Sequence, residues 1–218
     1  MRKIRQHVNP LSAHFMVTRA QPVARPPELA PGCPIEVELG CADAEFSFAR
    51  AAARPDMLMV GLDIREPCLA RNRVRAAEER LSNLLFGYVN LNVDIDVVFA
   101  PASVDRFHLL FPDPWVKKSH HKRRVIEPAL VASLAAQLRP GGELHVASDV
   151  FDVALEIMAT VEDPSLAHVG FVNQAGPWGF WRGNPFEASR REQTTLRREQ
   201  RVWRMRYVRG DMAVPTGP

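Results

Sequence analysis

Short apolar segments alternate with amphipathic segments from Ile35 onward, and this alternation constrains the fold more than any other feature of the chain. It predicts strands over residues 35–39, 57–64, 84–89, 104–111 and 144–147. Segments with helical spacing lie between or after them, at residues 46–54, 66–81, 127–138 and 151–161. Strands and helices in this order form parallel pairs joined by helical crossovers. We therefore expect an α/β fold with a doubly wound, mostly parallel sheet.

The chain is expected to divide into an arm and one domain. Residues 1–34 form the basic, Pro-rich arm, because five prolines between positions 22 and 34 exclude a long helix or a central strand. Residues 35–218 suit a single α/β core. Within that core, the helix over residues 66–81 has candidate inner positions at Leu69, Val74 and Ala77, and residues 139–143 (RPGGE) are expected to turn.

The segment FPDPWVKKSHHKRR, residues 111–124, places one acid between two prolines, directly before a cluster of cations. Asp113 follows an expected buried strand, at the sheet edge where open α/β folds bind ligands. Pro112 and Pro114 restrict the backbone around that carboxylate. A solvated basic loop is the alternative interpretation. The cations that suit a phosphate backbone are Lys117, Lys118, Lys122, Arg123 and Arg124.

Composition narrows the function classes. The formal net charge of +3 and the pI near 9.0 are mild for a nucleic-acid-binding protein, but the basic residues are concentrated in segments 117–124 and 182–209. Cys33, Cys41 and Cys68 are odd in number and lack CxxC spacing, which argues against a disulfide framework and a zinc site. No apolar run approaches the length of a membrane span, so we expect a soluble protein. The cysteine pattern adds the expectation of a cytoplasmic protein without a metal.

Further polar residues are expected at the same sheet edge. Glu38 and Gly40 end the first strand, where a turn lets a nucleotide-bearing cofactor approach the backbone. Asp63 ends the second strand, where dinucleotide-binding folds place an acid on ribose hydroxyls. The alternative is that Glu38 and Asp63 are only loop carboxylates. Because CADAE follows Gly40 in place of further glycines, the sequence argues against NAD.

Asn90 and Asp149 end the third and fifth strands. The amide of Asn90 has the donor and the acceptor needed to pair with an adenine edge, although asparagine also favours turns. Asp149 precedes a helix, so capping of that helix is an alternative to ligand binding. Both residues are expected at the edge that carries Asp113.

Six motifs, taken together and in this order, resemble the bacterial tRNA (guanine-N7)-methyltransferase family: IRQHVNPLS, VELG, GLDIR, FPDPWVKKSHHKRR, LRPGGELHVASD and SRRE. They span nearly the whole chain, and the fourth is the most specific. The resemblance implies a Rossmann-like class I methyltransferase fold with an antiparallel C-terminal strand. It also implies S-adenosylmethionine as cofactor and tRNA as substrate. It implies a monomer or homodimer with no obligate protein partner and no membrane association.

The resemblance also implies roles for single residues. Glu38, Gly40, Asp63 and Asn90 line the cofactor pocket, with Asn90 standing where many relatives carry Asp. Asp113 corresponds to the active-site aspartate and also lines that pocket. The GCADAE loop departs from the family's glycine-rich pattern, and Ser189 replaces the threonine of a Thr-x-x-Glu motif. Substrate contacts are implied for Lys117, Arg124, Asp149, Ser189 and Glu192.

The C-terminal residues 201–209, RVWRMRYVR, alternate as a strand does. Trp203, Met205 and Tyr207 share one face, which is expected to pack in the core, whereas Arg204 and Arg206 can contact phosphate from the other. Residues 176–186, GPWGFWRGNPF, are expected to form a loop that orders when tRNA binds.

The implied chemistry suits these residue types. Guanine N7 has a free lone pair at neutral pH, so methyl transfer needs alignment and no general base. Asp113 is expected to stabilise the positive charge that develops on the purine, and Glu192 or Asp149 could accept hydrogen bonds from guanine N1 and N2. Two alternatives stay open. One is a non-catalytic tRNA-binding relative; the other is a small-molecule methyltransferase or nicotinamide oxidoreductase, which leaves the basic segment 117–124 without a role.

Overall fold

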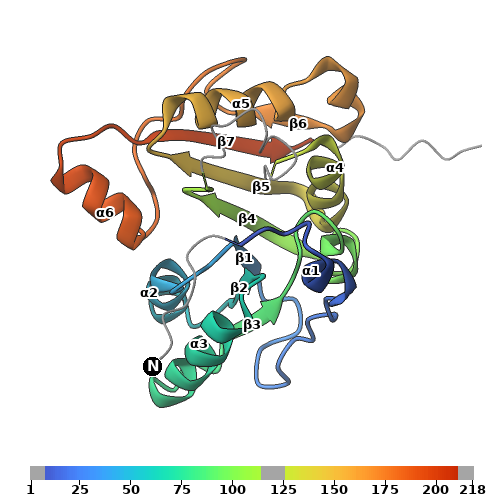
Figure 1. The fold of residues 1–218 in the computed structure, drawn as a ribbon, viewed down its shortest axis with the longest axis vertical. Coiled ribbons are helices and arrows are strands. Elements are labelled where there is room, and N and C mark those ends of the chain that lie inside the picture. The colour runs from blue at the N-terminus through green and yellow to red at the C-terminus, as the bar shows by residue number, and fades with distance from the viewer. Residues whose placement is uncertain (1–7, 114–125, 211–218) are drawn as a thin grey trace, which may run out of the picture.

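The computed structural model describes residues 8–113 and 126–210, and a seven-stranded sheet forms its centre (Figure 1). The strands are β1 (Ile35–Leu39), β2 (Leu58–Asp63), β3 (Leu84–Tyr88), β4 (Val104–Leu110), β5 (Leu138–Ser148), β6 (Phe171–Asn173) and β7 (Trp203–Arg209). Their order across the sheet is β3-β2-β1-β4-β5-β7-β6. The first five strands pair in parallel, whereas β7 is antiparallel to β5 and β6. The expected doubly wound sheet with an antiparallel C-terminal strand is therefore confirmed.

Helices cover both faces of the sheet (Figure 1). They are α1 (Ala13–Val17), α2 (Glu45–Ala53), α3 (Glu66–Glu78), α4 (Pro128–Gln137), α5 (Phe151–Val161) and α6 (Arg190–Arg197), with 3-10 turns η1 (Ile95–Val97) and η3 (Pro164–Val169). On one face, Phe46 of α2 and Leu69 of α3 pack with Met59 of β2. On the other face, Leu134 of α4 and Met158 of α5 join the larger core. The helices α2, α3, α4 and α5 thus each bury a largely apolar stripe against the sheet, whereas α1 buries none of its residues and α6 buries only Glu192 and Thr195.

The two faces differ in chemistry because the strands alternate. In β1, Val37 and Leu39 enter the larger core, while Glu36 and Glu38 point to the opposite face, and all four are buried. On that opposite face, β4, β5 and β7 also carry polar residues, among them His108 and His145. The loop residues Trp181 and Phe186 lie over this part of the sheet. Buried charges are therefore built into the polar face, and each needs a partner.

Two expectations about the core are wrong. Leu69 is fully buried as predicted, but Val74 is 60% exposed and Ala77 is exposed. Asn72 and Ala76 take the inner face of α3 instead, since the Asn72 side-chain amide donates a 2.8 Å hydrogen bond to the Ala42 carbonyl. The spacing of apolar residues cannot predict the burial of Asn72, because this polar side chain is buried through its hydrogen bond to the first loop.

The turn expected at residues 139–143 lies inside β5, which begins at Leu138 and not near residue 144. Leu138 pairs with Val104, and the next pair joins Glu143 to Arg106. Four residues therefore bulge out of the ladder between these pairs, with Gly141 at a φ of +73°. The glycines and proline that predict a turn here produce a bulge within a strand.

The arm residues from Val8 to Pro34 pack along the sheet. The backbone amide of Ala20 donates to the buried Asp94 carboxylate, and Val23 donates to the Val98 carbonyl at 2.9 Å. The arm's one described helix, α1, has only five residues, in keeping with the proline content. Among the residues that the structure describes, no helix is both long and apolar enough to cross a membrane.

Candidate functional site

A cavity of about 990 Å³ opens at the carboxyl ends of the parallel strands. Seven of the residues predicted from the sequence line it: Glu38, Gly40, Asp63, Asn90, Asp113, Asp149 and Ser189. Glu192 is not part of this lining, and Lys117 and Arg124 lie outside the described residues. The expectation that the strand-end residues share one sheet edge is therefore met by the geometry.

The GCADAE loop makes a tight turn at the floor of this cavity. The backbone amides of Gly40 and Cys41 both donate to the Leu62 carbonyl at 2.8 Å. Gly40 has a φ of +78°, and Ala42 and Ala44 have values of +49° and +56°. The left-handed conformation that glycine adopts freely is thus held here by two alanines, at a steric cost of about 1 kcal/mol each. Apart from its two chain neighbours, no atom of the residues that the structure describes lies within 4 Å of a Cβ built on Gly40, so the space above that turn is open.

Glu38 and Asp63 stand side by side on the floor but have different partners. Glu38 is buried and accepts a 2.5 Å hydrogen bond from the Ser47 hydroxyl. Burial raises the pKa of Glu38 to about 7, the Ser47 hydrogen bond lowers it in part, and Asp63 raises it further. Asp63 accepts hydrogen bonds from the Ala42 amide at 2.8 Å and from the Arg65 guanidinium at 2.8 and 2.9 Å. Asp63 therefore holds the first loop in place and is covered by Arg65.

Arg65 is a functional candidate that the sequence reasoning missed. Its signal was present in GLDIR, since a guanidinium two residues after a strand-end acid can fold back onto it. The hydrogen bond with Asp63 raises the pKa of Arg65, and the charge of Asp113 adds to that shift. Arg65 thus interacts with an acid that ends β2 and with one that follows β4, the two strands on either side of β1.

Asn90 is fully buried, and its amide holds the arm. Its Nδ2 donates to the carbonyl oxygens of Pro10 at 2.9 Å and Phe15 at 3.4 Å. Val8 and Pro10 line the cavity. The donor atoms that we expected to pair with an adenine edge therefore contact the arm, which forms one wall of the cavity.

Asp113 lines the cavity just beyond β4. The strand ends at Leu110, one residue earlier than expected, and Phe111 has a φ of +51°. Its backbone amide donates to the Ala147 carbonyl at 2.7 Å, which ties the turn to β5. The direction of the Asp113 segment is thus set by the strained Phe111 as well as by Pro112.

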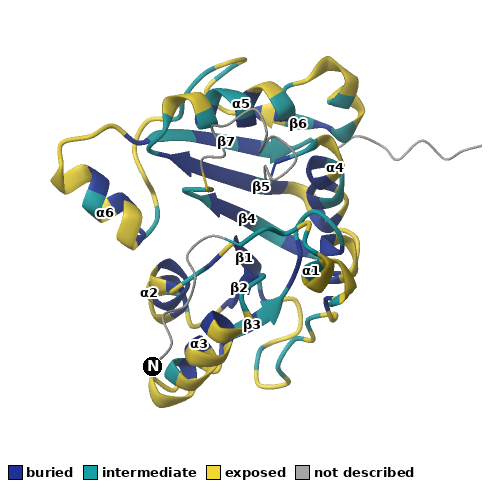
Figure 2. Ribbon diagram, viewed as in Figure 1, coloured by how far each residue is buried: buried dark blue, intermediate teal, exposed yellow. Residues whose placement is uncertain are grey.

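Asp149 links β5 to α6. Its carboxylate accepts from Arg191 Nε at 2.7 Å and from the Thr195 hydroxyl at 3.3 Å. The N-cap of α5 is Val150, with no side-chain cap, so the capping alternative for Asp149 is wrong. Arg190 lies 3.7 Å from Asp43 in the first loop. The N-terminal part of α6, most of whose side chains are exposed (Figure 2), therefore reaches both walls of the cavity.

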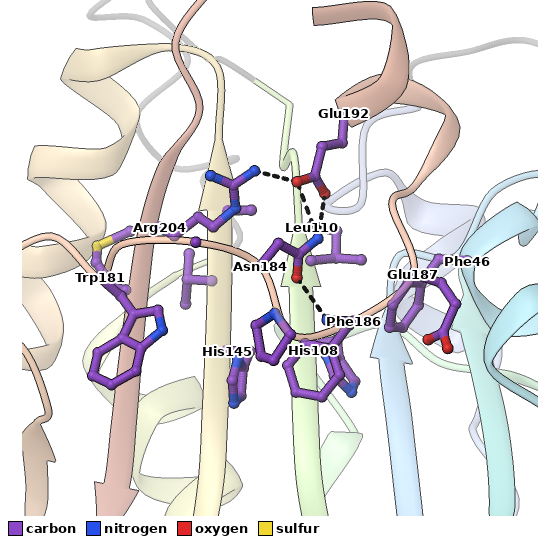
Figure 3. A pocket seen from close by; sticks show the side chains of 15 residues that line it. Phe46, His108, Leu110, His145, Trp181, Asn184, Phe186, Glu187, Glu192 and Arg204 are labelled. Carbon is purple, nitrogen blue, oxygen red and sulfur yellow. Dashed lines mark hydrogen bonds and ion pairs between the residues drawn. The ribbon is translucent and has the colours of Figure 1, made fainter. Parts of the chain in front are cut away.

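Glu192 faces a second, smaller pocket (Figure 3). Its carboxylate accepts two hydrogen bonds from the Asn184 amide, at 3.0 and 3.1 Å, and pairs with Arg204 of β7. Ser189 caps α6 by accepting from the Glu192 backbone amide at 3.2 Å. Arg204, which we expected to contact phosphate, thus positions the Glu192 carboxylate instead. Strand alternation predicted the face of β7 on which Arg204 lies, but not its partner.

An ionic cluster below this pocket was also missed. The Glu36 carboxylate accepts from Arg50 at 2.8 and 3.0 Å, from His108 Nε2 at 2.9 Å, and from Arg106. Glu143 likewise binds Arg106, His145 and Arg206, so Arg206 is committed to an ion pair. Burial lowers the pKa of His108 to about 4, which keeps that ring neutral. The cluster is structural, and no single segment of the sequence reveals it.

Comparison with known proteins agrees with this geometry. A family model described as "Putative methyltransferase" matches residues 33–204. The tRNA (guanine-N(7)-)-methyltransferase of Prochlorococcus marinus MIT 9303 is 34% identical over 97% of this chain and 90% of its own length. That of Thermosynechococcus vestitus is 34% identical over 95% of both chains.

Solved structures share the fold at lower identity. The antibiotic-resistance methyltransferase Kmr superposes with a TM-score of 0.56 at 17% identity, covering 88% of this chain and all of its own. The 16S rRNA methyltransferase KamB gives 0.55 at 17% identity with the same coverage. The fold is thus that of class I methyltransferases, and the chain belongs to the tRNA (guanine-N7)-methyltransferase family.

Proposed function

We propose that this protein transfers a methyl group from S-adenosylmethionine to N7 of a guanine in the tRNA variable loop. The observation that carries the proposal is the cavity itself. It brings Glu38, Asp63, Asn90 and Asp113 together in a chain that matches these methyltransferases over almost its whole length. A cavity of about 990 Å³ is also large enough for a nucleoside cofactor beside a base.

The residues present suit the cofactor. The open space above Gly40 lets a ligand approach the backbone, and carboxylates surround it that can accept hydrogen bonds from hydroxyl and ammonium groups. The cofactor supplies an electrophilic methyl group on a sulfonium ion. Glu38, Gly40, Asp63, Asn90 and Asp113 would hold it, with the buried Asn90 acting through the arm wall.

The chain's own contribution to the reaction is alignment and charge. Asp113 lies at the cavity and its carboxylate would stabilise the positive charge that forms on the methylated purine. Asp149, Ser189 and Glu192, joined through α6, are the proposed substrate contacts on the same side. Lys117 and Arg124 would supply phosphate contacts. We propose the division into an arm, residues 1–34, and one domain, residues 35–218, and a cytoplasmic monomer or homodimer.

The test is methyl transfer from labelled S-adenosylmethionine to unmodified tRNA, followed by borohydride reduction and aniline cleavage. These reagents cut at 7-methylguanosine. Cleavage at a variable-loop guanine is the expected result. Tight tRNA binding with no transfer would instead support the non-catalytic alternative, and transfer to another atom or to a small molecule would refute the proposed substrate.

A further inference from the structure

Three aromatic rings and one arginine form a cluster beside the cavity but outside its lining: Phe151, Phe180, Trp203 and Arg201. We call it the aromatic cluster. The ring centroids of Phe151 and Trp203 are 4.5 Å apart, and those of Phe180 and Trp203 are 4.8 Å apart. The Arg201 guanidinium lies 4.1 Å from the centroid of the Trp203 ring, a cation–π arrangement.

The chain connects the aromatic cluster to the cavity in two places. Trp203 begins β7 opposite Ser148, where β5 ends. Asp149 and Val150 follow Ser148 and line the cavity, and Phe151 is the next residue. Gln200 also lines the cavity and directly precedes Arg201. The cluster therefore extends the cavity along the carboxyl edge of the sheet.

Core packing accounts for only part of the aromatic cluster, because Phe180 and Trp203 pack against the larger core whereas the Phe151 ring is exposed. Phe151 continues the stripe of α5 that buries Ala154, Met158 and Val161, yet 43% of its own surface is exposed. Trp203 is partly buried and packs against the larger core together with the buried Met205 and Tyr207, so the expectation that this strand face packs in the core is met. The exposed Phe151 ring lies where β5 has ended and α5 begins.

The charges around the aromatic cluster indicate what it binds. Arg201 is exposed and makes no ion pair within residues 8–113 and 126–210. Other exposed cations occupy α6 and the residue after it. Arg190 and Arg191 pair with Asp43 and Asp149, whereas Arg197 and Arg198 make no ion pair with a described residue. An exposed aromatic ring close to the Arg201 guanidinium matches an unstacked base and its phosphate, which is how proteins hold single-stranded RNA.

Building on the proposed function, we propose that the aromatic cluster is a stacking platform for a nucleotide of the tRNA that flanks the target guanine. Drawing the guanine out of its stack frees the neighbouring base. The base stacks on the exposed Phe151 ring, which packs against Trp203 and Phe180. Arg201 contacts the phosphate of the same nucleotide.

The first test is tRNA affinity measured without cofactor. Phe151→Ala should weaken binding about tenfold, within the range that stacking of one base provides, and leave the cofactor dissociation constant unchanged. Phe151→Trp should retain affinity. Val172→Ala is the control for loss of an exposed apolar side chain, because Val172 is 57% exposed on β6 and pairs with Val208, at the other end of β7 from Trp203. Equal affinities for wild type and Phe151→Ala would overturn the proposal.

The second test uses tRNA with an abasic nucleotide on either side of the target guanine. Removing the stacked base should weaken binding to the wild type as much as Phe151→Ala does, and the two changes together should cost no more than either. If the losses of affinity from the abasic nucleotide and from Phe151→Ala were additive, the platform would be overturned. It would also be overturned if Phe151→Ala changed self-association of the protein and left tRNA affinity unchanged. These binding assays do not depend on methyl transfer, so they can fail independently of the proposed function.

Salt dependence separates the two components of the platform. Arg201→Ala should reduce the slope of log affinity against log salt by about one, because one phosphate contact is lost. Phe151→Ala should leave the slope unchanged, because stacking releases no counterions. A reduced slope for Phe151→Ala would show that its effect is indirect and would count against stacking.

Discussion

Glu36 and Glu38 show how far the surroundings of a residue decide its chemistry. They lie two residues apart on the same face of β1, and both are buried. Burial raises the pKa of Glu38 to about 7, and hydrogen bonding with Ser47 offsets that rise only in part. Burial also opposes ionisation of Glu36, but hydrogen bonds from His108 and Arg50 outweigh it and hold the pKa of Glu36 well below the ordinary value. Glu38 therefore titrates close to neutral pH, whereas Glu36 is ionised throughout the physiological pH range.

The first prediction concerns stability against pH. The folded-state pKa of Glu38 is raised, so its contribution to stability is fully present below about pH 4.5 and is lost as the pH rises through about 7. Glu38→Gln should therefore stabilise the protein by up to about 3 kcal/mol at pH 8 and by little at pH 4. Urea unfolding at both pH values measures this.

Glu36→Gln is the matched control on the same strand face. Because the pKa of Glu36 is depressed, its stabilising effect is present above about pH 4.5, and the substitution should destabilise the protein at pH 8. The same sign of change for both variants at pH 8 would contradict the assigned environments.

The second prediction concerns the strained alanines of the first loop. Ala42 and Ala44 have left-handed backbones, so glycine at either position should raise the free energy of unfolding by about 0.5–1 kcal/mol, after the entropy cost of glycine. Ala49→Gly, on the exposed side of α2, should lower it by about 1 kcal/mol. Thermal unfolding distinguishes the signs, and destabilisation by all three glycines would disprove strain at the loop.

At the scale of elements, the sequence predicted which segments form strands and helices but not what holds them together. The five parallel strands and α5 follow from apolar periodicity, because each buries its own pattern. The position of the arm depends on Asn90 and Asp94, polar residues whose partners lie more than 70 residues away. The placement of α6 depends on Asp149 in the same way. Such long-range hydrogen bonds leave no periodic trace.

The third prediction concerns the arm. Asn90→Asp keeps the shape of the side chain, but a carboxylate cannot donate to the carbonyls of Pro10 and Phe15 and lies near Asp94. The arm should loosen, and trypsin should cut after the exposed Arg19 at least tenfold faster, which corresponds to about 1.4 kcal/mol of local stability.

Cleavage after the exposed Arg198, on α6's side of the cavity, serves as the internal control and should not change. The Asn90→Asp protein should also bind the cofactor more weakly than the wild type. In proteins that lack the arm through Phe15, Asn90→Asp should no longer change cofactor affinity. An effect of Asn90→Asp that persists in full without the arm would instead assign Asn90 a direct contact with the cofactor.

At the scale of the whole molecule, the carboxyl edge of the sheet gathers the predicted residues because parallel strands all end there. That much of the site was predictable from the sequence. Glu192 was assigned to the substrate from its motif, but its carboxylate is bound by Arg204 and Asn184 across the polar face. The ionic cluster around Glu36 and Glu143 joins several strands and α2, so it emerges only when the sheet and α2 assemble.

We propose that Asp113 acts at this edge on a guanine aligned with the cofactor. The most direct measurement is the single-turnover rate of methyl transfer to tRNA for wild type and Asp113→Asn, with tRNA affinity measured in parallel. We expect a rate about 10²–10³-fold lower at unchanged affinity, because a preorganised charge is lost and binding is not. A wild-type rate in Asp113→Asn would show that the Asp113 carboxylate does not stabilise the transition state.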